Sequence, residues 1–503
     1  MTGTAVTHAT DPDIAHAHMM LQRAWWASRA FERYAPDRVA AIVDAVAHAA
    51  HAEAGRYAEW AVQETGMGVA EHKRLKNELS SLGIAEAYRD HDFASARIDA
   101  ESGIVELPRP AGVVLALTPS TNPVSTLFFK VVIALMTRNA IVVSPHPLAR
   151  ACCVDAARLL ADAAVRAGAP DGVVQVVEHP SIPLIEALMS DELTDVIVAT
   201  GGSAVVRAAY RSGNPAIGVG PGNVPVFVDD SADLEAAASL LVASKSFDNS
   251  VLCTNESTLI VEASIAERFS RELQLQGAHV CSDEEADLLR GGLFRDGHFR
   301  PDLVGRDAPT LAREAGLRVD ERTRILVAPF PLVVPEEPLC TEKLFPCLGM
   351  VSVPDVRHGI AAARAVVRHS GAGHSAVIHS QRPATVMAYA AAVDVLRVAV
   401  NVGGSTGSAG FDTNLAPTMT IGTGFFGRSS VGENLAPKHL VNWTRIAYPS
   451  GLERLPDFSG LQPYASDLPA AAPEPTESAV IAHDLREQVR ALIIDELRDL
   501  VAR

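Results

Sequence analysis

The sequence predicts an α/β protein with two doubly wound lobes. Beyond residue 110, short apolar runs alternate with helical stretches, which is typical of a parallel sheet covered by helices on both faces. A second alternating set follows residue 253 and predicts a second lobe, with a cleft between the two. Of the 503 residues, 48% are hydrophobic and 20% are charged, which is a globular rather than a disordered composition.

The expected elements follow in chain order. Residues 13–90 are expected to be helical, because their apolar positions recur every three to four residues. The first lobe is expected to contain strands at 113–117, 140–143, 173–177, 196–199 and 225–228, and helices at 125–136, 152–166, 182–189 and 204–211. The second is expected to contain strands at 257–261 and 376–378 and a helix at 358–367. Sheets of this kind bind ligands in the loops beyond their strands.

Charge and cysteine content exclude several classes of protein. With 43 basic and 60 acidic residues, the net charge of −17 argues against a nucleic-acid or membrane-surface binder. The most apolar stretch, 112–136, is interrupted by Pro119, Pro123 and Lys130, so no membrane span is expected. The six cysteines show no disulfide or zinc spacing, and no secretory leader is recognisable. We therefore expect a cytoplasmic protein with free thiols and no metal site.

The end of the chain differs in composition. Residues 451–475 are rich in proline and alanine and are expected to form a linker. An amphipathic helix is expected at 476–503, and its apolar stripe cannot be buried by the helix itself. The helix is therefore expected to dock on a partner, to contact another subunit or to form a coiled coil.

Two residues stand out as candidates for chemistry. Cys253 precedes a predicted strand at the junction between the lobes, although a single cysteine is more often a buried apolar residue than a nucleophile. Asn122 lies in a strand-to-helix loop, where its amide can donate to a developing oxyanion or simply form an Asn-Pro turn. The residues alone leave both alternatives open.

Three glycine-rich segments have different meanings. Residues 200–203 follow a strand and open a helix, which suits backbone contact with a phosphate. Residues 218–223 join two predicted strands. The segment 422–427 matches GxGxxG literally but does not join a strand to a helix, so we interpret it as a false positive for a dinucleotide site.

Six segments in order resemble the aldehyde dehydrogenase superfamily, and more narrowly its CoA-acylating branch. They are TPSTNPVST, TRNAIVVSPHP, GVGPGNVPVFVD, SKSFDNSVLCTNES, EKLFP and PKHLVNWTRIAY. The resemblance covers roughly residues 15–450. It implies a Rossmann-like cofactor domain, a catalytic cysteine domain and a small oligomerisation element.

The resemblance also implies roles for particular residues. Cys253 is the expected nucleophile, and the Asn122 amide and the Cys253 backbone N–H are the expected oxyanion donors. Glu342 is expected to hold the nicotinamide ribose. The other residues expected to bind cofactor are Thr118, Pro119, Ser120, Ser144, Pro145, His146, Gly201, Gly202, Ser203, Val219, Gly220 and Leu344.

One departure from the hydrolytic members is informative. Those enzymes carry a glutamate, which activates water, at the position of Val219. Valine cannot accept a proton, so the thioacyl-enzyme is expected to await the thiolate of CoA. Oxidation to a free acid is correspondingly disfavoured.

The implied organisation divides the chain into five parts. They are a cofactor domain at 1–235 (with 92–108 contributing to oligomerisation), a catalytic domain at 236–432, an oligomerisation strand at 433–450, the linker at 451–475 and the helix at 476–503. The helix resembles the encapsulation peptides of bacterial microcompartment enzymes, which bind shell or cargo proteins. A dimer or tetramer inside a microcompartment is expected.

The expected activity is oxidation of propionaldehyde or acetaldehyde to its CoA ester with NAD, although NADP is not excluded. An acylating sulfoacetaldehyde dehydrogenase is the alternative substrate class. An inactive assembly scaffold is the alternative of another kind.

Overall fold

The structure is a computed structural model and describes residues 12–450 and 454–458. The chain divides into two compact units, one holding residues up to 95 together with 108–445, and the other holding 96–107 together with the chain from 446 onward. The helix expected at 476–503 and most of the linker expected at 451–475 lie outside the described residues. No helix among the described residues is long and apolar enough to span a membrane.

The first sheet is the parallel sheet expected after residue 110. Its strand order is β5-β4-β3-β6-β7, and all neighbouring pairs are parallel. The strands are β3 (Val113–Leu117), β4 (Ala140–Ser144), β5 (Val174–Val176), β6 (Val196–Thr200) and β7 (Ala216–Val219). Every residue of β3 and β4 is buried, because helices cover both faces of such a sheet.

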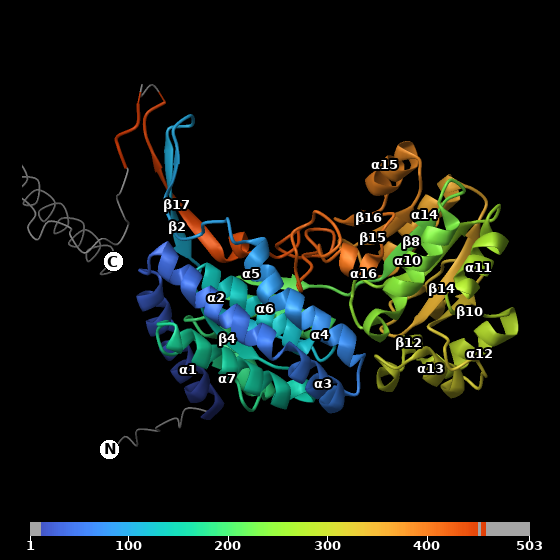
Figure 1. Ribbon diagram of the computed structural model, residues 1–503, viewed down its shortest axis with the longest axis horizontal. Helices are drawn as coiled ribbons and strands as arrows, with labels where there is room; N and C mark the ends of the chain where they lie inside the picture. The colour runs from blue at the N-terminus through green and yellow to red at the C-terminus, as the bar shows by residue number, and fades with distance from the viewer. Residues whose placement is uncertain (1–11, 451–453, 459–503) are drawn as a thin grey trace, which may run out of the picture. The chain divides into compact units, whose positions relative to one another are not determined.

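The region before this sheet is helical, as predicted, and several helices gather over the sheet (Figure 1). It contains α1 (Pro12–Phe31), α2 (Pro36–Ala52), α3 (Ala54–Thr65), α4 (Ala70–Glu78), the π-helical turn η1 (Leu79–Gly83) and α5 (Ile84–Ala87). The crossover helices are α6 (Pro123–Met136), α7 (Arg150–Arg166), α8 (Ile182–Ser190) and α9 (Ser203–Arg211), with a short turn η2 (Pro147–Ala149). Nearly all of α6 is buried, because α2 and α4 pack against it. The apolar sequence of α6 is therefore explained by burial inside the protein.

The second sheet has seven parallel strands in the order β10-β13-β14-β9-β8-β15-β16. They are β8 (Val224–Val228), β9 (Glu256–Glu262), β10 (Ala278–Val280), β13 (Ile325–Pro329), β14 (Cys347–Val353), β15 (Ala376–His379) and β16 (Val398–Val400). The strand expected at 225–228 therefore forms, but it belongs to this second sheet. The two-lobed α/β class predicted from the sequence is confirmed.

Successive residues of β8 pack on opposite faces of the second sheet. Val226 joins one hydrophobic cluster with α10 and α11, whereas Phe227 joins another with α12, α13 and α14. The helices are α10 (Leu234–Ser246), α11 (Ala266–Leu275), α12 (Asp283–Leu293), α13 (Ala308–Glu314), α14 (Val356–His369) and α15 (Pro383–Ala392). Both faces are thus covered, as in the first sheet.

A third sheet has three strands in the order β1-β2-β17. They are β1 (Arg97–Asp99), β2 (Ile104–Pro110) and β17 (Val441–Ala447), and β1 pairs antiparallel with β2. Short elements complete the described chain: η3 (Phe247–Ser250), β11 (Phe294–Arg295), β12 (His298–Phe299), η4 (Pro301–Leu303), η5 (Pro338–Cys340), α16 (Gly404–Gly407) and η6 (Pro437–Leu440). The segment 422–427 forms a turn, which agrees with its interpretation as a false positive.

The two candidate residues lie at opposite ends of their sheets. Asn122 follows the carboxyl end of β3, whereas Cys253 precedes the amino end of β9. The chain crosses from the first sheet to the second between β7 and β8, at residues 220–223. The glycine-rich segment predicted to join two strands therefore joins two sheets.

Candidate active site

A cleft of about 450 Å3 is lined by residues from both lobes. Of the residues expected from the sequence, it is lined by Pro119, Ser120, Asn122, His146, Gly201, Gly202, Ser203, Val219, Gly220, Cys253, Glu342 and Leu344. Thr118, Ser144 and Pro145 are buried at the adjoining ends of β3 and β4 and do not line it. The Thr118 N–H instead donates to the Ser144 carbonyl at 3.1 Å, so these residues support the lining from behind.

Cys253 lies between η3 and β9 and remains partly exposed to the cleft. A Cβ atom on Gly222 would lie 1.9 Å from the Cys253 carbonyl oxygen, so only glycine fits at position 222. Burial of the surroundings, and then the charge of Glu342, raise the pKa of Cys253 to about 12, whereas the charges of Arg397 and Lys76 lower it. Burial and the nearby Glu342 carboxylate therefore both disfavour the thiolate.

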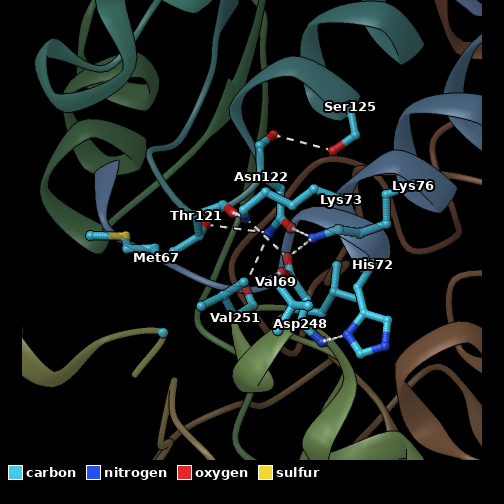
Figure 2. Close-up of polar contacts among 12 residues, drawn as sticks. Met67, Val69, His72, Lys73, Lys76, Thr121, Asn122, Ser125, Asp248 and Val251 are labelled. Atoms are coloured by element: carbon cyan, nitrogen blue, oxygen red, sulfur yellow. Dashed lines mark hydrogen bonds and ion pairs between the residues drawn. The ribbon is translucent and has the colours of Figure 1, made fainter. Parts of the chain in front are cut away.

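The loop before Cys253 has an unusual backbone. Asp248, Asn249 and Ser250 all adopt positive φ, at 49°, 49° and 63°. Such conformations are rare for residues other than glycine and persist where surrounding contacts enforce them. Here the Asp248 carboxylate accepts the Val69 N–H at 2.6 Å, and the Asp248 N–H donates to Nδ1 of His72 at 2.8 Å (Figure 2).

Asn122 precedes α6 as its N-cap, yet its side chain accepts no capping hydrogen bond. Instead Nδ2 donates to the Val251 carbonyl at 3.0 Å and to Thr121 Oγ1 at 3.3 Å. Its Oδ1 accepts a hydrogen bond from the ammonium group of Lys76 (Figure 2). The interpretation as a simple Asn-Pro turn explains the backbone, but the side chain is directed toward the loop that carries Cys253.

Glu342 approaches the site from the segment between η5 and β14. Its Oε1 accepts the Gly222 N–H at 2.8 Å. Burial raises the pKa of this carboxyl, while that hydrogen bond and the charges of Lys245 and Lys343 lower it. Among the described residues that line the cleft, Glu342 is the one carboxylate, and none is Lys or Arg.

The segment 201–203 presents backbone to the cleft. Gly202 is the N-cap of α9, whose first residue is Ser203. A Cβ atom on Gly202 would meet nothing within 4 Å, so the space beside it is open. A helix N-terminus with open space beside it suits a phosphate, because the first N–H groups of a helix lack partners within the helix. The cleft thus has open space at the amino end of α9, where an anion can approach backbone N–H groups, and a carboxylate at Glu342 that can accept a hydrogen bond.

Val219 ends β7, is 4% exposed and lines the cleft. The structure therefore places a buried apolar side chain at this position of the cleft.

Sequence reasoning missed four polar residues near the cleft: Lys73, Lys76, Asp248 and His374. The two lysines lie one turn apart on α4 and both contact Asp248. The His374 ring lies against Gly222, its Nε2 is buried without a hydrogen-bond partner, and burial lowers its pKa to about 3. The sequence AEHKRLKNE is rich in charged residues and predicts a solvent-exposed helix. In the structure, Lys73 and Lys76 of this helix are buried.

Away from the cleft, His279, Cys281 and Glu285 place potential metal-ligand atoms within 4.8 Å of one another. His279 and Glu285 already pair at 3.2 Å, and Glu285 completes the capping box of α12. These local contacts account for the arrangement.

Residues 1–299 match the aldehyde dehydrogenase family. The chain is 38% identical over 427 residues to an aldehyde-alcohol dehydrogenase of Clostridium acetobutylicum, covering 84% of this chain and 49% of that one. The chain thus spans about half the length of the first curated relatives it matches.

Other relatives match over nearly their whole length. A succinate-semialdehyde dehydrogenase (acetylating) of Clostridium kluyveri is 33% identical, with 87% of this chain and 97% of that one covered. A sulfoacetaldehyde dehydrogenase (acylating) of Cupriavidus necator is also 33% identical, with 88% and 90% covered.

Solved structures agree with these matches. An acetylating aldehyde dehydrogenase from Geobacillus thermoglucosidasius gives a TM-score of 0.85 at 37% identity, covering 88% of this chain and 98% of that one. A Rhodopseudomonas palustris propionaldehyde dehydrogenase with bound propionyl-CoA gives 0.77 at 27%, covering 86% and 94%. A propionaldehyde dehydrogenase from the fucose utilisation microcompartment of Clostridium phytofermentans gives 0.78 at 27%, covering 87% and 98%.

Proposed function

Because this chain belongs to the aldehyde dehydrogenase family, we propose that it oxidises a short-chain aldehyde to its CoA ester with reduction of NAD. The observation that carries the proposal is that Cys253 and Asn122 line one cleft, which has Val219 where a water-activating carboxylate would be needed. The relatives named as acylating enzymes support the same branch.

The first half-reaction acylates the enzyme. The Cys253 thiol loses its proton to solvent in the cleft, and the thiolate attacks the aldehyde carbon, which converts the carbonyl oxygen into an oxyanion. One N–H of Asn122 and the backbone N–H of Cys253 donate to this oxygen, and one such donor is typically worth about 3–4 kcal/mol. The bound nicotinamide supplies the hydride acceptor. Collapse of the oxyanion then leaves a thioester on Cys253.

The second half-reaction releases the product. A carboxylate at position 219 would deprotonate water and lead to a free acid, but Val219 cannot do so. The other carboxylate of the cleft, Glu342, accepts the Gly222 N–H and is assigned to the cofactor ribose. The CoA thiolate attacks the thioester carbon, forms acyl-CoA and returns Cys253 as a thiolate. Two half-reactions of this kind predict ping-pong kinetics.

The lining of the cleft also favours a substrate class. A sulfonate or second carboxylate on the aldehyde would need a cationic partner. No Lys or Arg lies among the described lining residues, and the lining is mostly apolar or backbone. This supports an uncharged aldehyde such as propionaldehyde or acetaldehyde over sulfoacetaldehyde.

Assembly and location extend this proposal. We propose a cytoplasmic homo-oligomer, with 441–447 in an oligomerisation sheet and 476–503 binding a shell or cargo protein of a microcompartment. The matching enzyme from a fucose utilisation microcompartment supports that location. Removal of 476–503 should leave turnover intact and stop co-purification with shells; unaltered co-purification would exclude this role.

The activity is tested by a screen of aldehydes with NAD or NADP, with and without CoA. Acyl-CoA formation that depends on aldehyde supports the proposal. Free acid as the sole product would indicate a hydrolytic enzyme, and no turnover with any aldehyde would favour an assembly scaffold.

A further inference from the structure

A buried cation lies directly behind the Asn122 amide. The Lys76 side chain is 3% exposed, and its ammonium group donates both to Oδ1 of Asn122 and to Oδ2 of Asp248 (Figure 2). Lys76 comes from α4, Asn122 from the loop after β3, and Asp248 from the loop before Cys253. A single ammonium group thus joins three separate segments.

The contact with Lys76 decides which end of the amide faces the cleft. An ammonium group has only donors, so only the oxygen of Asn122 can face it. A flipped amide would place two N–H groups against a buried cation and leave Oδ1 against the Val251 carbonyl. The contact therefore directs Nδ2 toward Val251, two residues before Cys253, at 3.0 Å. The longer 3.3 Å contact of Nδ2 with Thr121 is the one that an incoming oxyanion would replace.

Two lysines share the Asp248 carboxylate. Lys73 contacts the same Oδ2 of Asp248 at 3.0 Å, so two ammonium groups share one carboxylate. Lys73 donates its other hydrogen bond to the Thr121 carbonyl at 2.8 Å and does not contact the Asn122 side chain. The hydrogen bond that the Lys76 ammonium group donates to Oδ1 polarises the amide, which strengthens its N–H groups as donors.

We propose that Lys76 is a positioning residue that holds and polarises the Asn122 amide for the oxyanion formed on Cys253. This inference rests on the proposed acylating chemistry. In the same arrangement Asp248 has two functions: it keeps Lys76 buried, and it anchors the strained turn that leads to Cys253. The charge of Lys76 also lowers the pKa of that thiol, against the effect of burial.

The test is a double-mutant cycle on the first half-reaction, measured as the burst of NADH from aldehyde and NAD without CoA. Lys76→Met is expected to slow the burst about 10- to 100-fold, as loss of part of one oxyanion donor would. If Lys76 acts through Asn122, adding Lys76→Met to Asn122→Ala should slow the burst less than about threefold further. Multiplication of the two single effects would overturn the proposal.

Two further variants separate positioning from folding. Lys73→Met removes a lysine from the same carboxylate but leaves the Asn122 contact, and it is expected to slow the burst several-fold less than Lys76→Met. If Lys73→Met and Lys76→Met slow the burst equally, the effect comes from loss of a contact to Asp248 and not from the contact with Asn122. Lys76→Gln retains a donor for Asn122 and should recover part of the rate; a Gln variant as slow as Met would contradict positioning.

The wild-type protein separates this inference from the proposed function. Wild type without an aldehyde-dependent burst would refute the proposed chemistry. The second outcome is a normal burst in wild type and an equal burst in Lys76→Met, with Cys253 labelled equally by iodoacetamide in both proteins. This outcome would refute only the role of Lys76.

Discussion

Gly222 and Glu342 are joined by a hydrogen bond of 2.8 Å from the glycine N–H to Oε1 of the carboxylate. Gly222 also lies against the Cys253 carbonyl, where a Cβ atom would come within 1.9 Å. One residue of the segment that joins the two sheets therefore contacts both the expected ribose-binding residue and the backbone of the expected nucleophile.

This relationship makes Gly222→Ala a severe change. The added Cβ must displace the Cys253 backbone, and a misplacement of about 1 Å can lower catalysis roughly 100-fold. Overpacking should also lower the free energy of unfolding by about 1–3 kcal/mol. Steady-state kinetics and urea denaturation measure the two effects.

Gly291→Ala is the matched control, because a Cβ there meets nothing within 4 Å in α12. It should keep full activity and gain up to about 1 kcal/mol of stability from the better helix former. Similar behaviour of the two variants would contradict the close approach at Gly222.

Replacement of the thiol removes the group that forms the acyl-enzyme. Cys253→Ala is expected to abolish aldehyde-dependent NADH formation, since no other side chain is proposed to bond the substrate. Cys281→Ala, at a buried cysteine outside the cleft, should retain activity. Substantial turnover by Cys253→Ala would show that the nucleophile is elsewhere.

Introduction of a base at residue 219 should change the product. In Val219→Glu, a carboxylate on the cleft can deprotonate water, so the ratio of free acid to acyl-CoA should rise several-fold. Val219→Gln has nearly the same shape without a base and should keep the wild-type ratio. Chromatography of both products measures this ratio. An equal ratio in the Glu and Gln variants would exclude the proposal that the lack of a base at position 219 prevents hydrolysis.

His379 provides a test of pH-dependent stability away from the cleft. Burial lowers its pKa to about 4, whereas the unfolded chain has a value near 6.5. As pH falls, the unfolded chain therefore protonates His379 at a higher pH than the folded chain does. The free energy of unfolding decreases between about pH 6.5 and 4, by roughly 1.4 kcal/mol per pH unit.

Asparagine cannot titrate, so His379→Asn should lose less stability between pH 6.5 and 4 than the wild type does. Denaturant unfolding at a series of pH values gives both curves. Parallel curves would show that His379 is protonated at the same pH in the folded and unfolded chain.

The sequence predicted those features that depend on local patterns. Strands such as β3 and β4 were found because their whole length is apolar and turn residues flank them. Cys253 and Asn122 are candidates because each lies beside a predicted strand, but their catalytic roles come from the family resemblance and stay predictions. The strand at 225–228 was predicted, but its sheet was not, because β7 and β8 have similar apolar runs and only their pairing distinguishes them.

The cluster around Lys76 depends on contacts that no local pattern reveals. Lys76 and Asp248 are 172 positions apart, and Lys73, Lys76 and their neighbours look like the solvent-exposed face of a helix. Their burial follows only when the loop before Cys253 packs on α4. The positive φ of Asp248 also cannot be predicted from the sequence, because Asp, Asn and Ser are common in turns of every kind.

Acylation of Cys253 and transfer of the acyl group to CoA are tested most directly by the mass of the intact protein after one turnover. Aldehyde and NAD without CoA should add one acyl group to Cys253, and CoA should then remove it as one equivalent of acyl-CoA. If wild type forms no adduct, or if the adduct is lost as free acid at the same rate with and without CoA, Cys253 does not transfer an acyl group to CoA.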